Sequence, residues 1–247
     1  MAEQKFPSEM IDLPSNGKLY SKDSPLREGK IEIKYMTAKE EDILTSQNLI
    51  KKGIVIDRLL DSLIVTEGVS ASDLVLGDKN AVMVAARILA YGPEYTCSVT
   101  LPTTMEQREH TFNLADCPFK KIDEDIDENL FEIELPISKQ KIKFSILTGK
   151  EERLIDRDLK ASKKTGVSVL PELTTRLRYV IKEVDGDNSQ SVINQAAINM
   201  LSRDSMFLRE EIQRVSPDIK LVQEIDIEGE SVKVDIPMTV GFFWPNT

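Results

Sequence analysis

Two cysteines and one histidine, Cys97, His110 and Cys117, are the residues of this chain best suited to bind a metal ion. They lie in and beside a segment of alternating apolar and polar residues that predicts a β-hairpin. A structural zinc site needs four cysteine or histidine ligands, usually in tight pairs such as C-x-x-C, because each short loop presents both ligands of a pair to one ion. This chain offers three candidates and no such pair. We therefore expect no bound metal and no cofactor.

The chain also lacks the residue patterns of an enzyme. Nucleophilic catalysis needs a serine or cysteine beside an oriented base, and the sequence holds a single histidine and no G-x-S-x-G motif. Two turns that lead from a strand into a helix, MTAKEE and LTGKEE, carry glutamates that would repel a phosphate group. Nothing singles out an acid and base pair among the many carboxylates. We expect a protein without catalytic activity.

The composition limits the kinds of partner that the chain can bind. The 247 residues include 42 acidic and 32 basic side chains, and the formal net charge of -10 opposes attraction to nucleic acid and to anionic membranes. No apolar run approaches the roughly 18 to 20 residues of a membrane-spanning helix. Two cysteines are too few for a disulfide framework, which suits a reducing compartment. We expect a protein of the cytoplasm with neither nucleic acid nor membrane as partner.

The elements that would position any site occur twice along the chain. IEIKYMTAKEEDIL begins at Ile31 and IKFSILTGKEERLI at Ile142, so that Thr148 lies 111 residues after Thr37. Each segment starts with alternating apolar residues, typical of a half-buried strand. Each continues with the T-x-x-E spacing of a capping box, in which threonine and glutamate bond the first backbone N–H groups of a helix. The repeated unit is therefore a strand, a cap and a helix.

Further similarity predicts the rest of the fold. Helical spacing of apolar residues recurs in IVIDRLLDSLIV and LTTRLRYVIKEV, then in AVMVAARILAYGPEY and SMFLREEIQRVSPDI. Alternating segments around polar turns close each copy as a β-hairpin: YTCSVTL with HTFNL, and KLVQEIDI with SVKVDIP. We predict an internally duplicated α+β fold. Each half has a strand, a helical cluster and a hairpin resembling a degenerate zinc ribbon, and a pseudo-twofold axis relates the halves.

Four regions follow from this pattern. Proline and glycine punctuate residues 1–30, which we expect to form an extended N-terminal arm. The first α+β repeat is expected at 31–118 and the second at 131–247, the latter including an aromatic C-terminal tail. Between them, residues 119–130 carry a run of acidic side chains that is typical of a solvated linker.

Two segments are candidates for contact with other proteins. Phe242, Phe243 and Trp244 stand next to one another before Pro245, close to the last residue of the sequence. They either close the core of the second half or anchor an interface, because adjacent side chains of an extended segment point in opposite directions. In the arm, the corresponding interface candidates are Leu13, Pro14, Leu19 and Tyr20.

The combined motifs resemble a known family. LPSNGKLY, MTAKEEDILTSQNLIKKG, YGPEY and the SRDSMFLR to FFWP stretch together are similar to baseplate proteins of T-even-type contractile-tailed phages, among the hub subunits and hub assembly factors. The resemblance spans nearly the whole chain and implies a structural protein. It also implies C-x-x-C knuckles in the hairpins of many members. This chain departs from that pattern at 101–107 and 225–230, so the resemblance gives no support for a metal here.

These observations predict a structural or adaptor protein of a baseplate hub, retained in the tail baseplate of the virion after assembly in the host cytoplasm. Its expected partners are other hub or tail proteins, with self-association as a further alternative. An assembly chaperone that binds hub or tail-tube proteins and then leaves is the second hypothesis. A zinc-ribbon protein that binds nucleic acid is the third, and it would need ligands that the sequence lacks.

Overall fold

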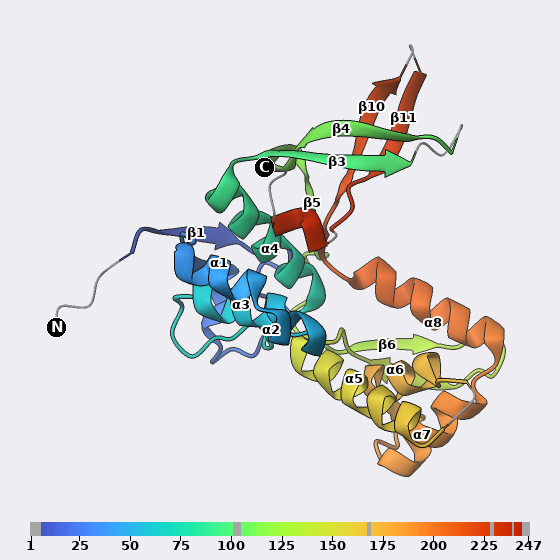
Figure 1. The fold of residues 1–247 in the computed structure, drawn as a ribbon. Helices are drawn as coiled ribbons and strands as arrows, with labels where there is room; N and C mark the ends of the chain where they lie inside the picture. Colours follow the sequence, from blue (N-terminus) through green and yellow to red (C-terminus); the bar gives the residue numbers. More distant parts are fainter. Residues whose placement is uncertain (1–5, 101–104, 167–168, 228–229, 239, 244–247) are drawn as a thin grey trace.

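The computed structural model describes residues 6–100, 105–166, 169–227, 230–238 and 240–243. Within these residues the fold is mixed α+β, with helices packed around small antiparallel sheets of two or three strands (Figure 1). Buried apolar residues from Leu13 to Phe243 belong to one hydrophobic cluster. The expected α+β class is confirmed, and one shared core joins the two parts of the chain.

The first part begins with two paired strands, continues through four helices and ends in a hairpin that points away from them (Figure 1). Its elements are β1 (Ser8–Asp12), η1 (Pro25–Glu28), β2 (Lys30–Lys34), α1 (Ala38–Thr45), α2 (Gln47–Lys52), α3 (Val55–Leu63), α4 (Leu76–Tyr91), β3 (Glu94–Thr100), β4 (Gln107–Asn113), η2 (Leu114–Asp116) and β5 (Phe119–Lys120).

The second part follows a related order and also has four helices, with an additional strand, β8, between the second and third of them. Its elements are β6 (Phe131–Glu134), β7 (Lys141–Phe144), α5 (Gly149–Lys164), α6 (Glu172–Val180), β8 (Ile181–Val184), α7 (Gln190–Asn199), α8 (Ser202–Val215), β9 (Asp218–Ile219), β10 (Val222–Ile227), β11 (Glu230–Asp235) and η3 (Val240–Phe243). Strands β6, β7 and β8 form one antiparallel sheet, and β9 pairs with β5 of the first part.

Residues 6–30 do not form the extended arm that the sequence suggested. Strand β1 pairs with β2 in antiparallel register, with Ile11 opposite Ile31, so the predicted boundary at residue 30 separates two bonded strands. The glycines expected to mark an arm instead shape its turns: Gly17 and Gly29 both have positive φ, and a Cβ on either would meet backbone of the facing segment. The prolines and glycines of this segment therefore mark compact turns.

The acidic segment at 119–130 is bound to the rest of the protein near both of its ends. Its first residues form β5, and Ile122 is buried. The Lys18 ammonium donates to the carbonyl oxygen of Glu124 at 2.6 Å, and Arg27 forms an ion pair with Asp127. Basic side chains of the N-terminal turn thus neutralise part of the acidic run and hold it against the protein.

Both predicted capping boxes form. At α1 the Thr37 N–H and hydroxyl donate to the Glu40 carboxylate at 2.9 and 2.6 Å, and at α5 Thr148 makes the same bonds to Glu151 at 2.8 and 2.5 Å. Glu40 also accepts from the Lys34 ammonium at 2.8 Å. These bonds satisfy amides that a helix start otherwise leaves unpaired.

One predicted helix is shorter than expected. The apolar spacing of LTTRLRYVIKEV predicts a single helix, but α6 ends at Val180 and the chain becomes strand β8. The pairing of Ile181 with Phe144 of β7 explains the change, because it gives the backbone a sheet partner. In the first part only an isolated bridge between Ile33 and Ile64 occupies the comparable place.

The two parts meet where α5 begins beside the loop that precedes α4. The N–H of Gly149 donates to the carbonyl oxygen of Leu74 at 3.0 Å, and the N–H of Lys150 to that of Ser72 at 2.8 Å. A Cβ on Gly149 would lie 2.9 Å from Ser72 Cα, and one on Gly77 would overlap the carbonyl oxygen of Pro217. Backbone approaches backbone here at distances that only glycine permits.

These contacts do not repeat in the way a twofold axis requires. Such an axis would place Thr37–Ala38 on the second part as Thr148–Gly149 is placed on the first. Ala38 is instead exposed, while Gly149 is buried. The two parts therefore contact each other through different surfaces. These contacts do not fit the expected pseudo-twofold arrangement.

Replacement of Gly149 by alanine tests the close junction. Alanine favours helix more than glycine does, but its Cβ would press on the backbone at Ala71 and Ser72. We expect Gly149→Ala to lower the free energy of unfolding by about 1–3 kcal/mol, as overpacking does. Ala38→Gly, the reverse change at the first position of α1, should cost at most about 1 kcal/mol. Urea unfolding of both variants measures the difference, and a stabilised Gly149→Ala protein would contradict the packing.

Glu40 should make the free energy of unfolding depend on pH in the acid range. Burial alone would raise its pKa, but hydrogen bonds from Lys34, Thr37 and Ser62 lower it to about 2, from an ordinary 4.5. Because the folded pKa is depressed, the stabilising contribution is complete above pH 4.5 and is lost as pH falls toward 2.

We therefore expect the stability difference between the native protein and Glu40→Gln to shrink across this pH range in urea unfolding experiments. Glu28→Gln, at an exposed position of η1, controls for the loss of one negative charge. A difference that stays constant down to the acid limit would show that the Glu40 charge contributes nothing.

Candidate binding surfaces

The three metal candidates do not converge. Cys97 and His110 are opposite one another across β3 and β4, whereas Cys117 is buried beyond η2, where its sulfur lies 3.5 Å from the Gln223 amide nitrogen. Burial raises the pKa of both thiols, which favours their protonated form. In the part of the chain that the structure describes, no three His, Cys, Asp or Glu side chains are grouped so as to hold a metal.

The described part of the aromatic tail is buried. Phe242 and Phe243 are each 1% exposed, and their rings pack edge to face with centroids 5.3 Å apart. Phe242 also meets the ring of Tyr95 at 5.1 Å. Of the two alternatives for the tail, closing the core applies to these two side chains. Trp244 and Pro245 lie outside the described residues.

Arg87 fastens this tail to the first part of the chain. Its guanidinium is almost fully buried and donates to the carbonyl oxygens of Phe242, Gly92 and Glu94 at 2.9, 3.1 and 3.3 Å. It also lies 5.0 Å from the centroid of the Tyr91 ring, a favourable cation–π distance. A single side chain of α4 thus holds both the helix end and the C-terminal segment.

The four N-terminal interface candidates are part of the protein's own core. Leu13, Pro14, Leu19 and Tyr20 are all buried. Their turn is organised by Asp78, whose carboxylate accepts from the Ser15 N–H and hydroxyl at 2.9 and 2.6 Å and from the Tyr20 hydroxyl at 2.6 Å. The expectation that these residues contact a partner is therefore replaced by an internal role.

The second part also contains a buried aspartate that binds a turn. Asp204 is also fully buried, and its carboxylate accepts from the N–H groups of Ile137 and Ser138 at 2.8 and 3.0 Å. Asp78 and Asp204 are each the third residue of a long helix, α4 or α8. Each binds the turn that follows the first strand of its part. The signal that could have revealed it is the recurrence of Ile11–Pro14, IDLP, as IELP at 133–136.

The electrostatics of the two carboxylates differ. Burial raises the pKa of Asp78, against the effect of its Ser15 and Tyr20 donors. For Asp204 burial acts in the same direction, but the two backbone N–H groups outweigh it and the pKa falls. A buried carboxylate is tolerated where its oxygens accept hydrogen bonds, as both oxygens of Asp78 and of Asp204 do, so we assign both residues a structural role.

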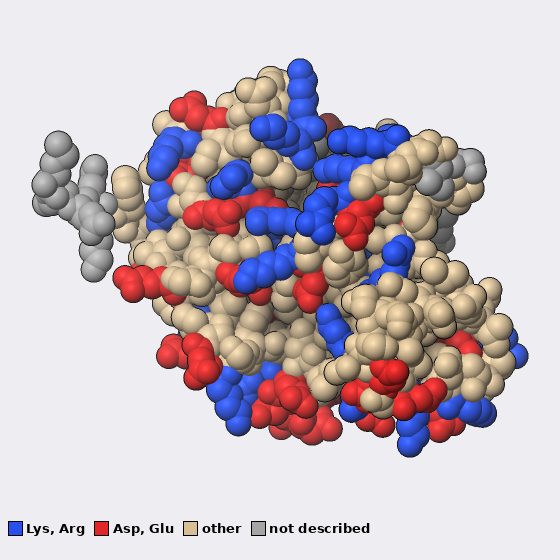
Figure 2. Space-filling model, turned by 90° about the horizontal axis from the view of Figure 1, so that it is seen from below, with Lys and Arg blue, Asp and Glu red and all other residues tan. Residues whose placement is uncertain are grey.

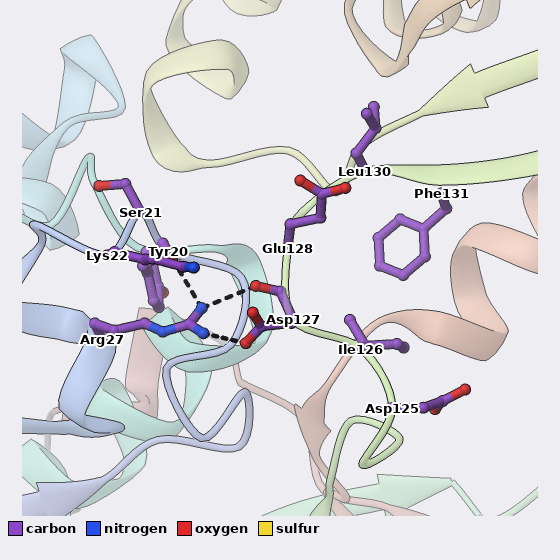
Figure 3. A pocket seen from close by; sticks show the side chains of 10 residues that line it. All are labelled: Tyr20, Ser21, Lys22, Arg27, Asp125, Ile126, Asp127, Glu128, Leu130 and Phe131. Carbon is purple, nitrogen blue, oxygen red and sulfur yellow. Dashed lines mark hydrogen bonds and ion pairs between the residues drawn. The ribbon is translucent and has the colours of Figure 1, made fainter.

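A pocket of about 600 Å³ lies where the N-terminal turn meets the acidic segment (Figure 3). Figure 3 shows the Arg27 guanidinium between the chain at Tyr20 and Asp127, with hydrogen bonds of 3.2 and 2.9 Å to their carbonyl oxygens. Asp125 and Glu128 line the same pocket. The Arg27 guanidinium already faces acceptors, and the carboxylates of the pocket would repel an anion, so we assign it no ligand.

A smaller apolar groove lies at the junction of α4, α5, α6 and α8. It has a volume of about 170 Å³, enough for one large side chain. Leu76 and Leu173 are 51% and 44% exposed at its margin. Arg176 pairs there with Glu152 at 2.5 Å, while Arg209 donates to the Ser205 carbonyl oxygen at 3.3 Å. The junction groove can therefore receive an apolar side chain next to an acidic one.

Charge is unevenly distributed on the surface. On the face shown in Figure 2, Lys and Arg side chains gather over the upper part, while Asp and Glu are denser along the lower edge. A protein with a net charge of -10 thus also presents basic regions to a partner. Such segregation orients an approaching protein of opposite charge.

Comparison with protein-family models, with curated proteins and with solved structures finds no match to this chain. Among the described residues no helix is both long and apolar enough to cross a membrane.

The Phe242 contacts predict a stability effect. Phe242→Ala would remove a fully buried ring from its contact with Tyr95 and from the space beside Arg87. We expect a loss of about 3–5 kcal/mol in the free energy of unfolding, as for other buried phenylalanines. Phe6→Ala, at a 42% exposed position, is the control and should change stability by less than about 1 kcal/mol. Equal thermal stability of the two variants would argue against a core role for the tail.

Proposed function

We propose that this chain is a structural adaptor of the baseplate hub of a contractile-tailed phage and acts by binding other hub or tail proteins. The order of its four sequence motifs supports the hub assignment. The junction groove supports binding by protein contact, because half-exposed leucines beside an arginine suit an apolar anchor with a neighbouring carboxylate. That groove is the observation that carries the proposal. The virion baseplate is the proposed location.

The proposal includes an internal duplication. Matching capping boxes at Thr37 and Thr148 support it, as do the buried Asp78 and Asp204 on equivalent helices and a hairpin after each of those helices. Both hairpins are two-stranded, which is compatible with a degenerate zinc ribbon. Duplication would give one chain two related but unequal surfaces, one for each of two neighbours in an assembly.

Capture of partners from infected cells tests the adaptor role. We expect tagged full-length protein to retain hub or tail proteins, and Leu173→Glu to lose them, because a carboxylate would enter the apolar groove beside Glu152. Leu154→Glu, a helical position 36% exposed on α5 outside the groove, is the matched control and should retain binding. Mass spectrometry identifies the captured proteins, and unchanged capture by Leu173→Glu would remove the groove from the proposal.

Mass spectrometry of purified virions separates the adaptor from an assembly chaperone. An adaptor is present in the particle in amounts comparable to the other hub proteins. A chaperone captures the same partners but is absent from virions. Retention of no phage protein by the tagged chain would contradict both roles.

A further inference from the structure

The start of α4 is covered by the second part of the chain. Val75, which precedes the helix, is fully buried and forms a bridge with Thr148. Ser72 is 6% exposed, and Gly77 is buried against Pro217. The surface that covers it consists of the end of α8 and the start of α5.

The start of α8 has no such cover. Asp204 lies 126 residues after Asp78, and the same offset pairs Ile198 with Ser72, Leu201 with Val75 and Met206 with Asn80. Those three apolar residues are 62%, 50% and 50% exposed. At the first helix Ser72 and Val75 are buried, and the partly exposed Asn80 bonds Asp218. The corresponding positions at the second helix therefore carry large, exposed apolar side chains.

A fourth apolar side chain extends this surface. Ile137 is 44% exposed, and its N–H donates to Asp204, which places it beside the first turn of α8. We name Ile137, Ile198, Leu201 and Met206 the distal patch. Figure 1 shows the beginning of α8 on the side of the molecule opposite β1. Exposed apolar groups gathered in this way mark an interaction site.

The first part has a matching surface without a cover. The covering segments of the junction are Thr148–Gly149 and Pro217–Asp218, and their counterparts are Thr37–Ala38 and Pro93–Glu94. Ala38, Pro93 and Glu94 are exposed. The chain thus uses one copy of each surface internally and leaves one copy of each unused.

Charge is complementary between the two unused surfaces. Arg203 is exposed in the middle of the distal patch, at the position that corresponds to Gly77. On the other surface Glu94 follows Pro93, as Asp218 follows Pro217. In the internal junction Asp218 accepts from the Asn80 amide at 3.1 Å, so an acid at this place already faces the start of the helix.

From these observations we propose that a second copy of this chain binds the distal patch through its exposed Ala38 and Pro93–Glu94 surface. The inference depends on the duplication proposed above, and it does not depend on which hub proteins the chain binds. The two contacting surfaces differ, so the association is head to tail, and repetition produces a ring or a filament. Arg203 prevents the close backbone approach that Gly77 allows, which makes this contact looser than the internal one.

Association of the purified full-length chain tests this inference. Sedimentation velocity from micromolar to near-millimolar concentration should show an average mass that rises from the 27.9 kDa of one chain to species larger than a dimer. Met206→Glu should raise the dissociation constant at least about tenfold, the effect of 1.4 kcal/mol. Leu154→Glu is again the matched control, and its association should equal that of the native chain.

A charge exchange identifies the second surface. Arg203→Glu alone should weaken association, and adding Glu94→Arg in the same chain should restore it, because the pair is then re-formed with opposite signs. Circular dichroism and melting temperature confirm that each variant is folded.

A monomer at every concentration, or a dimer that does not grow and ignores Met206→Glu, would overturn the proposal. A monomer that still captured hub proteins would overturn self-association and leave the adaptor role in place.

Discussion

The structure depends on buried carboxylates that hold turns of the chain at the beginning of long helices. Asp78 binds the turn at Ser15 and Tyr20, and Asp204 binds the turn at Ile137 and Ser138. A carboxylate without donors would be very costly at such depth, so each turn must adopt the conformation that presents its N–H or O–H groups. The first strand of each part is thereby fixed relative to the last long helix of that part, α4 or α8. A hairpin comes after each of these helices in the chain.

The need of buried polar groups for hydrogen-bond partners also decides which surfaces of the molecule are covered and which are exposed. The polar groups at the start of α5 are satisfied by carbonyl oxygens of the loop before α4, and glycines at 77 and 149 allow that approach. Arg87 then fastens the C-terminal segment across the end of α4. With these contacts made, the exposed apolar side chains include those of the junction groove and of the distal patch. A protein that works through contacts with other proteins would bind there.

Resemblance and structure contribute different parts of the functional argument. The family resemblance suggests the assembly, a phage baseplate hub, but names no surface. The structure places the exposed surfaces and defines their chemistry. Neither the aromatic tail nor the N-terminal turn, as far as each is described, supplies those surfaces, because the side chains that looked like anchors in the sequence are buried. The exposed leucines, methionine and isoleucines that replace them gave no comparable signal.

The sequence by itself determined the α+β class, both capping boxes and both hairpins, because each depends on residues close together in the chain. Threonine and glutamate three positions apart cap a helix wherever it is, and alternating residues around a polar turn pair with each other. Only the tertiary structure decided that Tyr20 and Phe242 are core, that α6 gives way to β8, and that the halves meet through unlike surfaces. Those outcomes depend on partners far away in the sequence: Asp78 for Tyr20, Arg87 for Phe242, Phe144 for Ile181. Local spacing cannot reveal which distant group supplies a hydrogen bond or covers a ring, and burial is decided by that group.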